Sequence, residues 1–157
     1  MSILIDSNIF LRLAFEEPGW EHCGKLLDSV YSGEHVAIIS AIQLSELYTP
    51  FERANDDEAK EKLATEIKKL RIKVRVVDEE ISRLSAQIRA KEKTPNGHWL
   101  ALADSIILAT ALQEEASTLY TLDTDFSRIK GRVKITAPGM PIEEWGKTYG
   151  YKKRMRT

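Results

Sequence analysis

Asp104 is the most informative acidic residue of the sequence, because it lies in a segment that is apolar on nearly every side. Residues 100–103 and 105–112 are mostly Leu, Ala and Ile, and the positions one helical turn before and after Asp104 are all apolar. An unpaired buried carboxylate costs roughly several kcal/mol. The charge must therefore be compensated by a salt bridge to Arg or Lys, by a position facing water, or by another cation.

Three further acids occupy positions from which they could join Asp104. Asp6 follows an apolar strand-like run, Asp123 follows another, and Glu46 lies in a helical segment between apolar neighbours. Each has an ordinary explanation, as a helix N-cap, a turn residue and a solvated helix residue respectively. In a parallel sheet built by right-handed crossovers, however, these strand ends and the helices beside them can meet at one edge.

A cluster of these four carboxylates would favour a divalent cation. Mg²⁺ or Mn²⁺ binds hard oxygen ligands, and its positive charge compensates the repulsion between them. A zinc site is not indicated, since the three histidines lack paired spacing and Cys23, the only cysteine, lies on the expected core face of a helix. An oxygen-only Mg²⁺ site with open positions is suited to hydrolysis of phosphodiester bonds. We therefore expect metal-dependent chemistry on a nucleic acid or phosphoester.

The elements that must position these acids alternate between strand and helix. Strands are expected at 2–5, 36–39, 74–77, 118–122 and 133–136. Helices are expected after Asn8 and over 20–32, 41–54, 55–70, 81–91 and 99–115, with Pro50 interrupting the third of these. This alternation predicts a three-layer α/β/α sandwich around a mostly parallel sheet of about five strands.

Length and composition fit one domain that needs no cross-links. The chain has 157 residues, 43% of them hydrophobic, and a formal net charge of −1, which excludes the strongly basic surface of a general DNA-coating protein. No apolar run approaches the roughly 18 residues of a membrane span, and the start lacks the features of a signal peptide. We expect a cytoplasmic protein with a domain over residues 1–141 and a basic, mobile extension over 142–157.

Four motifs in this order resemble the PIN-domain metal-dependent ribonucleases, and within them the VapC-like toxins of toxin–antitoxin pairs. The motifs are ILIDSN (3–8), SEL (45–47), LADSIILA (102–109) and YTLDTDF (120–126), and the resemblance extends from residue 1 to about residue 141. It implies that the metal-binding and catalytic acids are Asp6, Glu46, Asp104 and Asp123. It further implies supporting roles for Asn8 and Thr121, and a loop-holding or outer-shell role for Asp125.

The resemblance also implies a substrate and a partner. The substrate would be RNA, cut by water to leave a 5′-phosphate and a 3′-hydroxyl, and the partner a small antitoxin whose tail blocks the acidic groove. Basic residues should surround that groove, and candidates are Arg12, Lys130, Arg132 and the tail residues Lys152, Lys153, Arg154 and Arg156.

Other interpretations remain open at this point. The chain could be a PIN-domain protein of RNA processing or decay, or a non-catalytic PIN-like binding module. A receiver-like phosphoacceptor domain would use Asp78 but would need a Lys after the fifth strand, where residues 136–138 offer none. We also expect a homodimer, because the helices over 20–32 and 41–54 carry large apolar residues that a small sheet cannot fully cover, namely Trp20, Leu44, Leu47, Tyr48 and Phe51.

Overall fold

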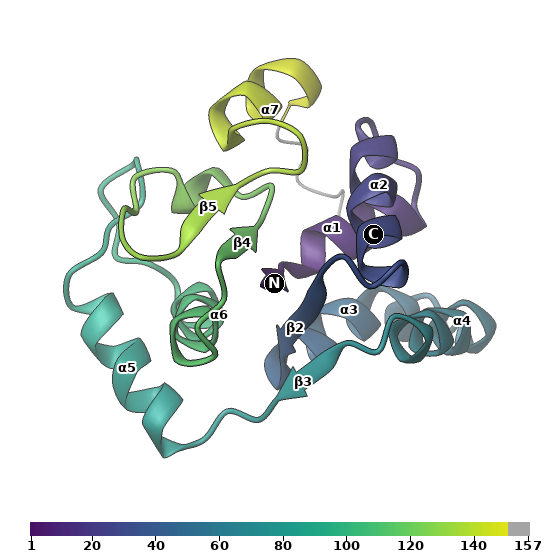
Figure 1. The fold of residues 1–157 in the computed structure, drawn as a ribbon, viewed down its shortest axis with the longest axis horizontal. Helices are drawn as coiled ribbons and strands as arrows, with labels where there is room; N and C mark the ends of the chain where they lie inside the picture. Colours follow the sequence, from purple (N-terminus) through teal and green to yellow (C-terminus); the bar gives the residue numbers. More distant parts are fainter. Residues whose placement is uncertain (151–157) are drawn as a thin grey trace.

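The computed structural model describes residues 1–150 and contains one five-stranded sheet (Figure 1). The strand order is β3-β2-β1-β4-β5, and all four pairings are parallel. The strands are β1 (Ser2–Ile5), β2 (Val36–Ser40), β3 (Lys73–Arg75), β4 (Thr118–Tyr120) and β5 (Lys134–Thr136). The chain builds the sheet from β1 towards β3 and then returns to the other side of β1. That reversal places a crevice at the carboxyl ends of β1 and β4.

Helices cover both faces of this sheet, which confirms the predicted α/β/α sandwich. They are α1 (Ser7–Ala14), α2 (Trp20–Tyr31), α3 (Ala41–Arg53), α4 (Asp57–Lys69), α5 (Glu79–Arg89), α6 (Leu102–Gln113), the short 3-10 helix η1 (Thr124–Phe126) and α7 (Ile142–Tyr149). No helix within residues 1–150 is long and apolar enough to cross a membrane.

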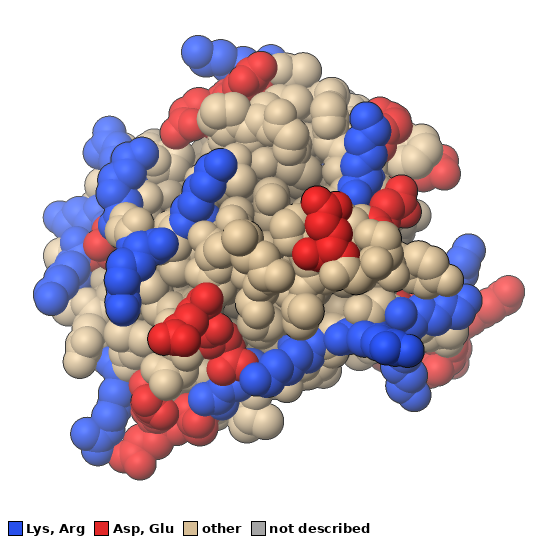
Figure 2. Space-filling model, viewed as in Figure 1, with Lys and Arg blue, Asp and Glu red and all other residues tan. Residues whose placement is uncertain are grey.

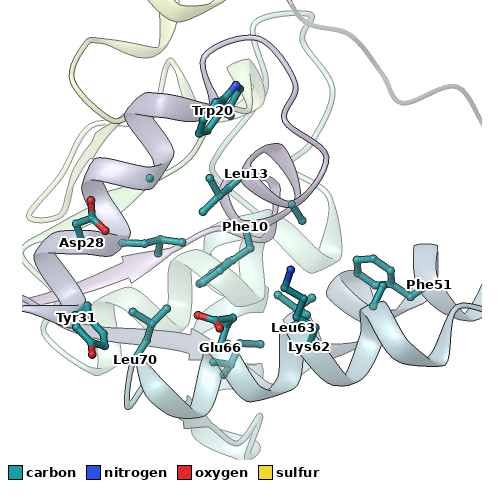
Figure 3. Close-up of a pocket in the computed structure, with 15 residues that line it drawn as sticks. Phe10, Leu13, Trp20, Asp28, Tyr31, Phe51, Lys62, Leu63, Glu66 and Leu70 are labelled. Atoms are coloured by element: carbon teal, nitrogen blue, oxygen red, sulfur yellow. The ribbon is translucent and has the colours of Figure 1, made fainter.

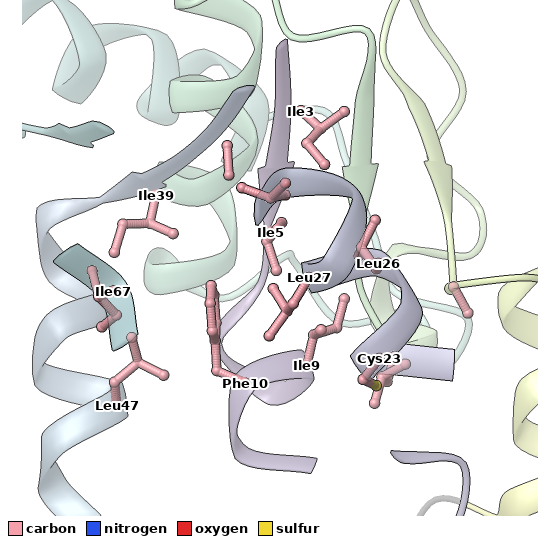
Figure 4. Close-up of a cluster of buried hydrophobic side chains, with 14 of the residues drawn as sticks. Ile3, Ile5, Ile9, Phe10, Cys23, Leu26, Leu27, Ile39, Leu47 and Ile67 are labelled. Carbon is pink, nitrogen blue, oxygen red and sulfur yellow. The ribbon is translucent and has the colours of Figure 1, made fainter. Parts of the chain in front are cut away.

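The side chains of β1 alternate between two separate hydrophobic clusters. Ile3 and Ile5 pack with residues of α1, α2 and α3 (Figure 4), whereas Leu4 packs with α5 and α6 on the opposite face. A central parallel strand is buried on both sides, so its residues are apolar without interruption. The buried Cys23 belongs to the first cluster, as its helix face predicted.

Local signals explain where most of the helices begin. Ser40 and Gln43 form a capping box at the start of α3, and the Asp78 side chain accepts a hydrogen bond from the Ile81 backbone N–H at the start of α5. Asp78 also pairs with Arg75, so this residue is a helix cap and not an isolated phosphoacceptor. Pro50 does not interrupt α3, because it lies near the end of the helix and removes a single backbone hydrogen bond there.

The helix that carries Asp104 begins later than we expected, at Leu102 and not at Trp99. The preceding backbone is engaged elsewhere: the Leu100 N–H donates to the Glu92 carbonyl, and Trp99 forms an antiparallel bridge with Lys93. These bonds hold residues 99–101 in a loop. Asp104 consequently lies in the first turn of α6 and not in the middle of a helix.

Helix α7 follows the point where we expected the domain to end. Ile142 and Trp145 are buried, and the Trp145 ring lies so close to Gly19 that a Cβ there would meet it at 2.6 Å. The packed structure therefore continues beyond residue 141, because an apolar helix face covers the turn before α2. The basic tail residues from 152 onward lie outside the described residues.

The apolar residues that suggested self-association are mostly used within the chain. Leu47 and Phe51 are buried, and Leu44 and Tyr48 pack against the first hydrophobic cluster. Dimerisation stays a prediction, but these side chains supply less exposed apolar surface than the sequence indicated.

Candidate active site

The acidic residues converge at the carboxyl edge of the sheet. Asp6 directly follows β1 and caps α1, and Asp123 lies just beyond β4 and caps η1. Asp104 occupies the first turn of α6. Carboxylate oxygens of Asp104, Asp123 and Asp125 all lie within 4.8 Å of one another. Three negative groups this close are the geometry expected of a cation site and are unfavourable without one.

Asp6 is the most rigidly held of these carboxylates. It is 5% exposed and accepts hydrogen bonds from the Thr121 hydroxyl at 2.7 Å, the Ser7 backbone N–H at 2.7 Å and the Asn8 side-chain amide at 3.3 Å. Burial raises its pKa to about 6 and the negative charge of Glu46 adds to the rise, while these hydrogen bonds oppose it. The orientation of Asp6 is therefore fixed by its neighbours.

Asp104 has the most strongly raised pKa of the cluster, about 8. Burial is the main cause, and the charges of Asp123, Asp6, Asp125 and Glu46 follow in that order. Within residues 1–150, no Lys or Arg forms an ion pair with any of these five acids. The salt bridge that would have explained Asp104 structurally is thus absent from the described part of the chain.

The pKa values of Asp123 and Glu46 are raised for the same two reasons, burial and nearby negative charge. Burial raises the pKa of Asp123 to about 6, against the hydrogen bond from the Asp125 backbone, and the charges of Asp125 and Asp6 contribute. Glu46 is exposed as a residue, yet loss of solvent at its carboxylate raises its pKa, as does the charge of Asp123. The four acids singled out in the sequence therefore lie close enough to repel one another.

Two residues that the sequence did not single out tie Glu46 to the site. The Ser7 hydroxyl donates to a Glu46 carboxylate oxygen at 2.9 Å. The buried Gln43 side chain donates to the Ile5 carbonyl at 2.8 Å and to the Ser7 hydroxyl at 3.4 Å. A polar residue at the third position of a capping box is a detectable signal for a helix start, but its contact with the end of β1 depends on the fold.

The predicted supporting residues contact Asp6 from two directions. Thr121 donates to Asp6 and accepts from the Asp123 backbone N–H at 3.1 Å, while Asn8 donates to both Asp6 and Thr121. Asp125 differs from our expectation in its position, because its own carboxylate joins Asp104 and Asp123 in the tightest group. It is therefore a candidate ligand itself and not only a residue of the supporting loop.

The proposed basic rim is only partly compatible with the structure. Arg12 is 8% exposed, donates to the Pro18 carbonyl at 3.0 Å and lies over the Trp145 ring. Arg12 packs α1 against α7. Its long side chain is packed and its guanidinium group is bonded within the fold, so it is not a surface residue available to RNA. Lys130 and Arg132 are exposed, and their contact with RNA stays a prediction.

The donor set fits a divalent metal ion. It consists of carboxylate oxygens, which are the ligands of Mg²⁺ and Mn²⁺, and it offers no imidazole or thiolate for zinc. No Lys or Arg among the described residues forms an ion pair with these carboxylates, so a bound cation would supply the compensating charge. The tightest group, Asp104, Asp123 and Asp125, would hold the ion together with the adjacent acids Asp6 and Glu46, which lie outside that group of three.

Thr121 provides a direct test of how the site is positioned. Thr121→Val keeps the shape of the side chain but removes the hydroxyl that bonds Asp6 and the Asp123 backbone. We expect catalytic activity to fall about 10- to 100-fold, the usual effect of losing an outer-shell partner of a metal ligand. The control is Thr110→Val, since Thr110 is equally buried but bonds only the Ile106 carbonyl within α6. Equal activity of both variants would contradict this role.

A separate pocket of about 650 Å³ lies between α1, α2 and α4 (Figure 3). Its lining is mainly apolar and includes Phe10 and Leu13 from α1, Trp20 from α2, and Leu63 and Leu70 from the other side. None of the five acids lines it. The molecule therefore has an apolar groove that is distinct from the acidic site.

The sheet order and the acidic cluster define an α/β domain with a carboxylate centre at the point where the strand order reverses across the sheet. The model of the PIN domain family matches residues 3–132. The chain belongs to the PIN-domain family, as the four motifs indicated. No curated protein sequence matches it.

Solved structures with this fold include several toxin–antitoxin proteins. A chain of VapBC2 from Rickettsia felis is 19% identical with a TM-score of 0.69, and the match covers 87% of this chain and 98% of that one. Mycobacterium tuberculosis VapC20, described as a Sarcin-Ricin loop cleaving toxin, is 17% identical with a TM-score of 0.64 and coverages of 84% and 98%. FitAcB from Neisseria gonorrhoeae is 26% identical with a TM-score of 0.61 and coverages of 87% and 97%.

Proposed function

We propose that this protein is a metal-dependent endoribonuclease that hydrolyses RNA phosphodiester bonds with Mg²⁺ or Mn²⁺. The observation that carries the proposal is the convergence of carboxylates from the ends of β1 and β4 and the first turn of α6, which have no ion-pair partner among the described residues. Burial and mutual repulsion raise the pKa values of Asp6, Asp104 and Asp123. Membership of the PIN-domain family supports the same chemistry. The proposed catalytic and metal-binding residues are Asp6, Glu46, Asp104 and Asp123, with Asp125 as an additional ligand.

Some residues of the site would bind the metal ion, and others orient the carboxylates that bind it. When bound, a divalent ion would polarise a phosphodiester oxygen and lower the pKa of the attacking water. Thr121 and Asn8 orient Asp6, and Ser7 orients Glu46. Water attacks phosphorus, a carboxylate of the cluster accepts its proton, and the bond to the 3′ oxygen breaks. The products are a 5′-phosphate and a 3′-hydroxyl that has taken a proton from solvent.

We further propose that the chain is the toxin of a type II toxin–antitoxin system and acts in the cytoplasm. Solved structures with the same fold include a toxin–antitoxin complex from Klebsiella pneumoniae and a toxin described as cleaving the Sarcin-Ricin loop. The partner would be a small antitoxin whose tail blocks the acidic site, and a further apolar segment of it would lie in the groove between α1, α2 and α4. That groove is lined by apolar residues and edged by Asp28, Lys62 and Glu66, which suits an amphipathic helix.

Metal removal tests the nuclease proposal. Purified protein incubated with structured RNA should cleave it in the presence of Mg²⁺ or Mn²⁺, stop cleaving when EDTA is added, and recover when excess metal is restored. Asp104→Asn protein purified in the same way controls for a contaminating nuclease. Cleavage that continues in the presence of EDTA would contradict the metal-dependent mechanism. Failure to cleave with any divalent metal would favour the non-catalytic binding module.

A further inference from the structure

Two large apolar side chains are exposed in the stretch of chain that leads into α6, the helix that carries Asp104. Trp99 and Leu102 are each 55% exposed, and Asp104 lies in the first turn of the helix that begins at Leu102. Because a chain spans at most about 3.6 Å per residue, the Cα atoms of Trp99 and Asp104 lie within about 18 Å of each other. Trp99 is therefore within reach of nucleotides that flank a phosphodiester held at the acidic edge.

The loop backbone holds Trp99 in a defined position. The Thr94 N–H donates to the His98 carbonyl at 2.8 Å, and the Leu100 N–H donates to the Glu92 carbonyl at 3.1 Å, so hydrogen bonds lie on both sides of Trp99. Leu100 is fully buried and anchors the end of the loop. A ring presented in this way loses little conformational freedom when a ligand packs on it, which favours binding.

A cation accompanies the exposed ring. The Lys93 ammonium lies over the Trp99 ring at 4.4 Å from its centroid. Lys and Arg side chains gather on the left of Figure 2, the side where Figure 1 shows α5, the loop after it and β5. Arg89 ends α5, Lys91 and Lys93 lie in the loop after it, and Lys134 begins β5. The segment between η1 and β5 adds Arg128, Lys130 and Arg132. An aromatic ring among basic side chains is the composition of surfaces that bind single-stranded nucleic acid.

We propose that Trp99 is a stacking platform for a base of the single-stranded RNA substrate and that Lys93 contacts the adjacent phosphate. This inference rests on the proposed nuclease function, because the acidic site fixes where the scissile bond lies. A base stacks on the ring face that Lys93 does not cover, and the ammonium compensates part of the repulsion between RNA and the acidic cluster. Trp99 is thus a substrate-positioning residue and takes no part in proton transfer.

Binding of RNA is measured separately from cleavage. All variants are made in an Asp104→Asn background with Mg²⁺ present, and fluorescence anisotropy follows a short end-labelled single-stranded RNA of mixed sequence. Trp99→Ala should weaken binding about 5- to 150-fold, the range that corresponds to loss of one base–aromatic stack. Trp99→Phe keeps an aromatic face and should retain most of the affinity. Lys93→Gln should reduce the slope of log affinity against log salt by about 0.7, the contribution of one phosphate contact on a single strand.

The matched control is Tyr31→Ala, which removes an exposed aromatic residue at the end of α2. It should leave RNA binding unchanged, and all variants should keep the melting temperature of the background protein. In the otherwise unchanged enzyme, Trp99→Ala should raise KM more than it lowers kcat. A merely structural role for Trp99 would instead lower the melting temperature and would not distinguish Phe from Ala in this way.

The outcomes separate this inference from the proposed function. If the parent protein cleaves RNA and Trp99→Ala binds and cleaves like it, the stacking proposal is overturned and the nuclease proposal stands. If Trp99→Ala weakens RNA binding but the parent never cleaves with any metal, the nuclease proposal fails and the stacking site remains. If Trp99→Ala changes only the mass measured by light scattering, Trp99 belongs to a protein interface and the RNA assignment is wrong.

Discussion

Asp104→Asn should lower RNA cleavage by more than about 100-fold, since loss of even an outer-shell partner of a metal ligand costs about 10- to 100-fold. The same substitution should leave the metal-free protein as stable as the parent or more stable. The Asp104 carboxylate is surrounded by four other acids, and burial together with their charges raises its pKa to about 8. A neutral amide of similar shape relieves that repulsion above about pH 8, where the carboxylate is ionised, and below it replaces a protonated, neutral carboxyl group at little cost. Cleavage assays and thermal melting with EDTA measure the two effects.

The control for this prediction changes the charge by the same amount away from the site. Asp57 lies exposed in the first turn of α4, and Asp57→Asn should leave cleavage unaffected. A structural role for Asp104 would give the opposite pattern, because breaking a buried ion pair costs about 3 to 5 kcal/mol. An Asp104→Asn protein that is strongly destabilised without metal and still cuts RNA would therefore refute the assignment of Asp104 to the site.

The strand ends were predictable because their signals are local. Asp6 terminates the apolar run Ile3–Ile5, and Asp123 follows a strand-like segment in which Thr alternates with apolar residues. Such segments indicate parallel strands whose carboxyl ends share an edge. The sequence therefore located two of the acids on the correct edge before any contact was known. Asp104 was identified for a different reason, because its charge conflicts with the apolar segment around it. Conflict between a residue and its local pattern is a useful indicator of function.

The contacts that hold the acids were less predictable, because they join distant parts of the chain. Ser7 and Gln43 read as residues of helix starts, and only the folded chain shows that Ser7 bonds Glu46 and Gln43 bonds the end of β1. Arg12 was expected at the rim of the acidic site because a negative site needs basic residues around it to attract RNA, yet it bonds the Pro18 carbonyl and lies over the Trp145 ring of α7. The sequence specifies which side chains are polar, while the fold decides which polar partners they meet.

The stability of the metal-free protein should fall as pH rises from about 4 to about 8. The pKa values of Asp6 and Asp123 are raised to about 6 and that of Asp104 to about 8, whereas an aspartate in the unfolded chain titrates near 3.9. In this window the folded state binds more protons than the unfolded state. Raising the pH removes these protons at a cost to the folded state, so the free energy of unfolding decreases.

Mg²⁺ should reverse this dependence, because the ion binds the deprotonated carboxylates and stabilises only the state that binds it. The gain in melting temperature on adding Mg²⁺ should therefore be small near about pH 5 and should reach several degrees near about pH 8, since about 1 kcal/mol shifts the melting temperature of a chain this size by about 2 to 4 °C. Asp104→Asn should show a weaker pH dependence without metal and a smaller gain with it. If the metal-free protein became more stable between these pH values, or if Mg²⁺ stabilised it equally at both, the carboxylates would not form a repulsive cluster that a cation neutralises.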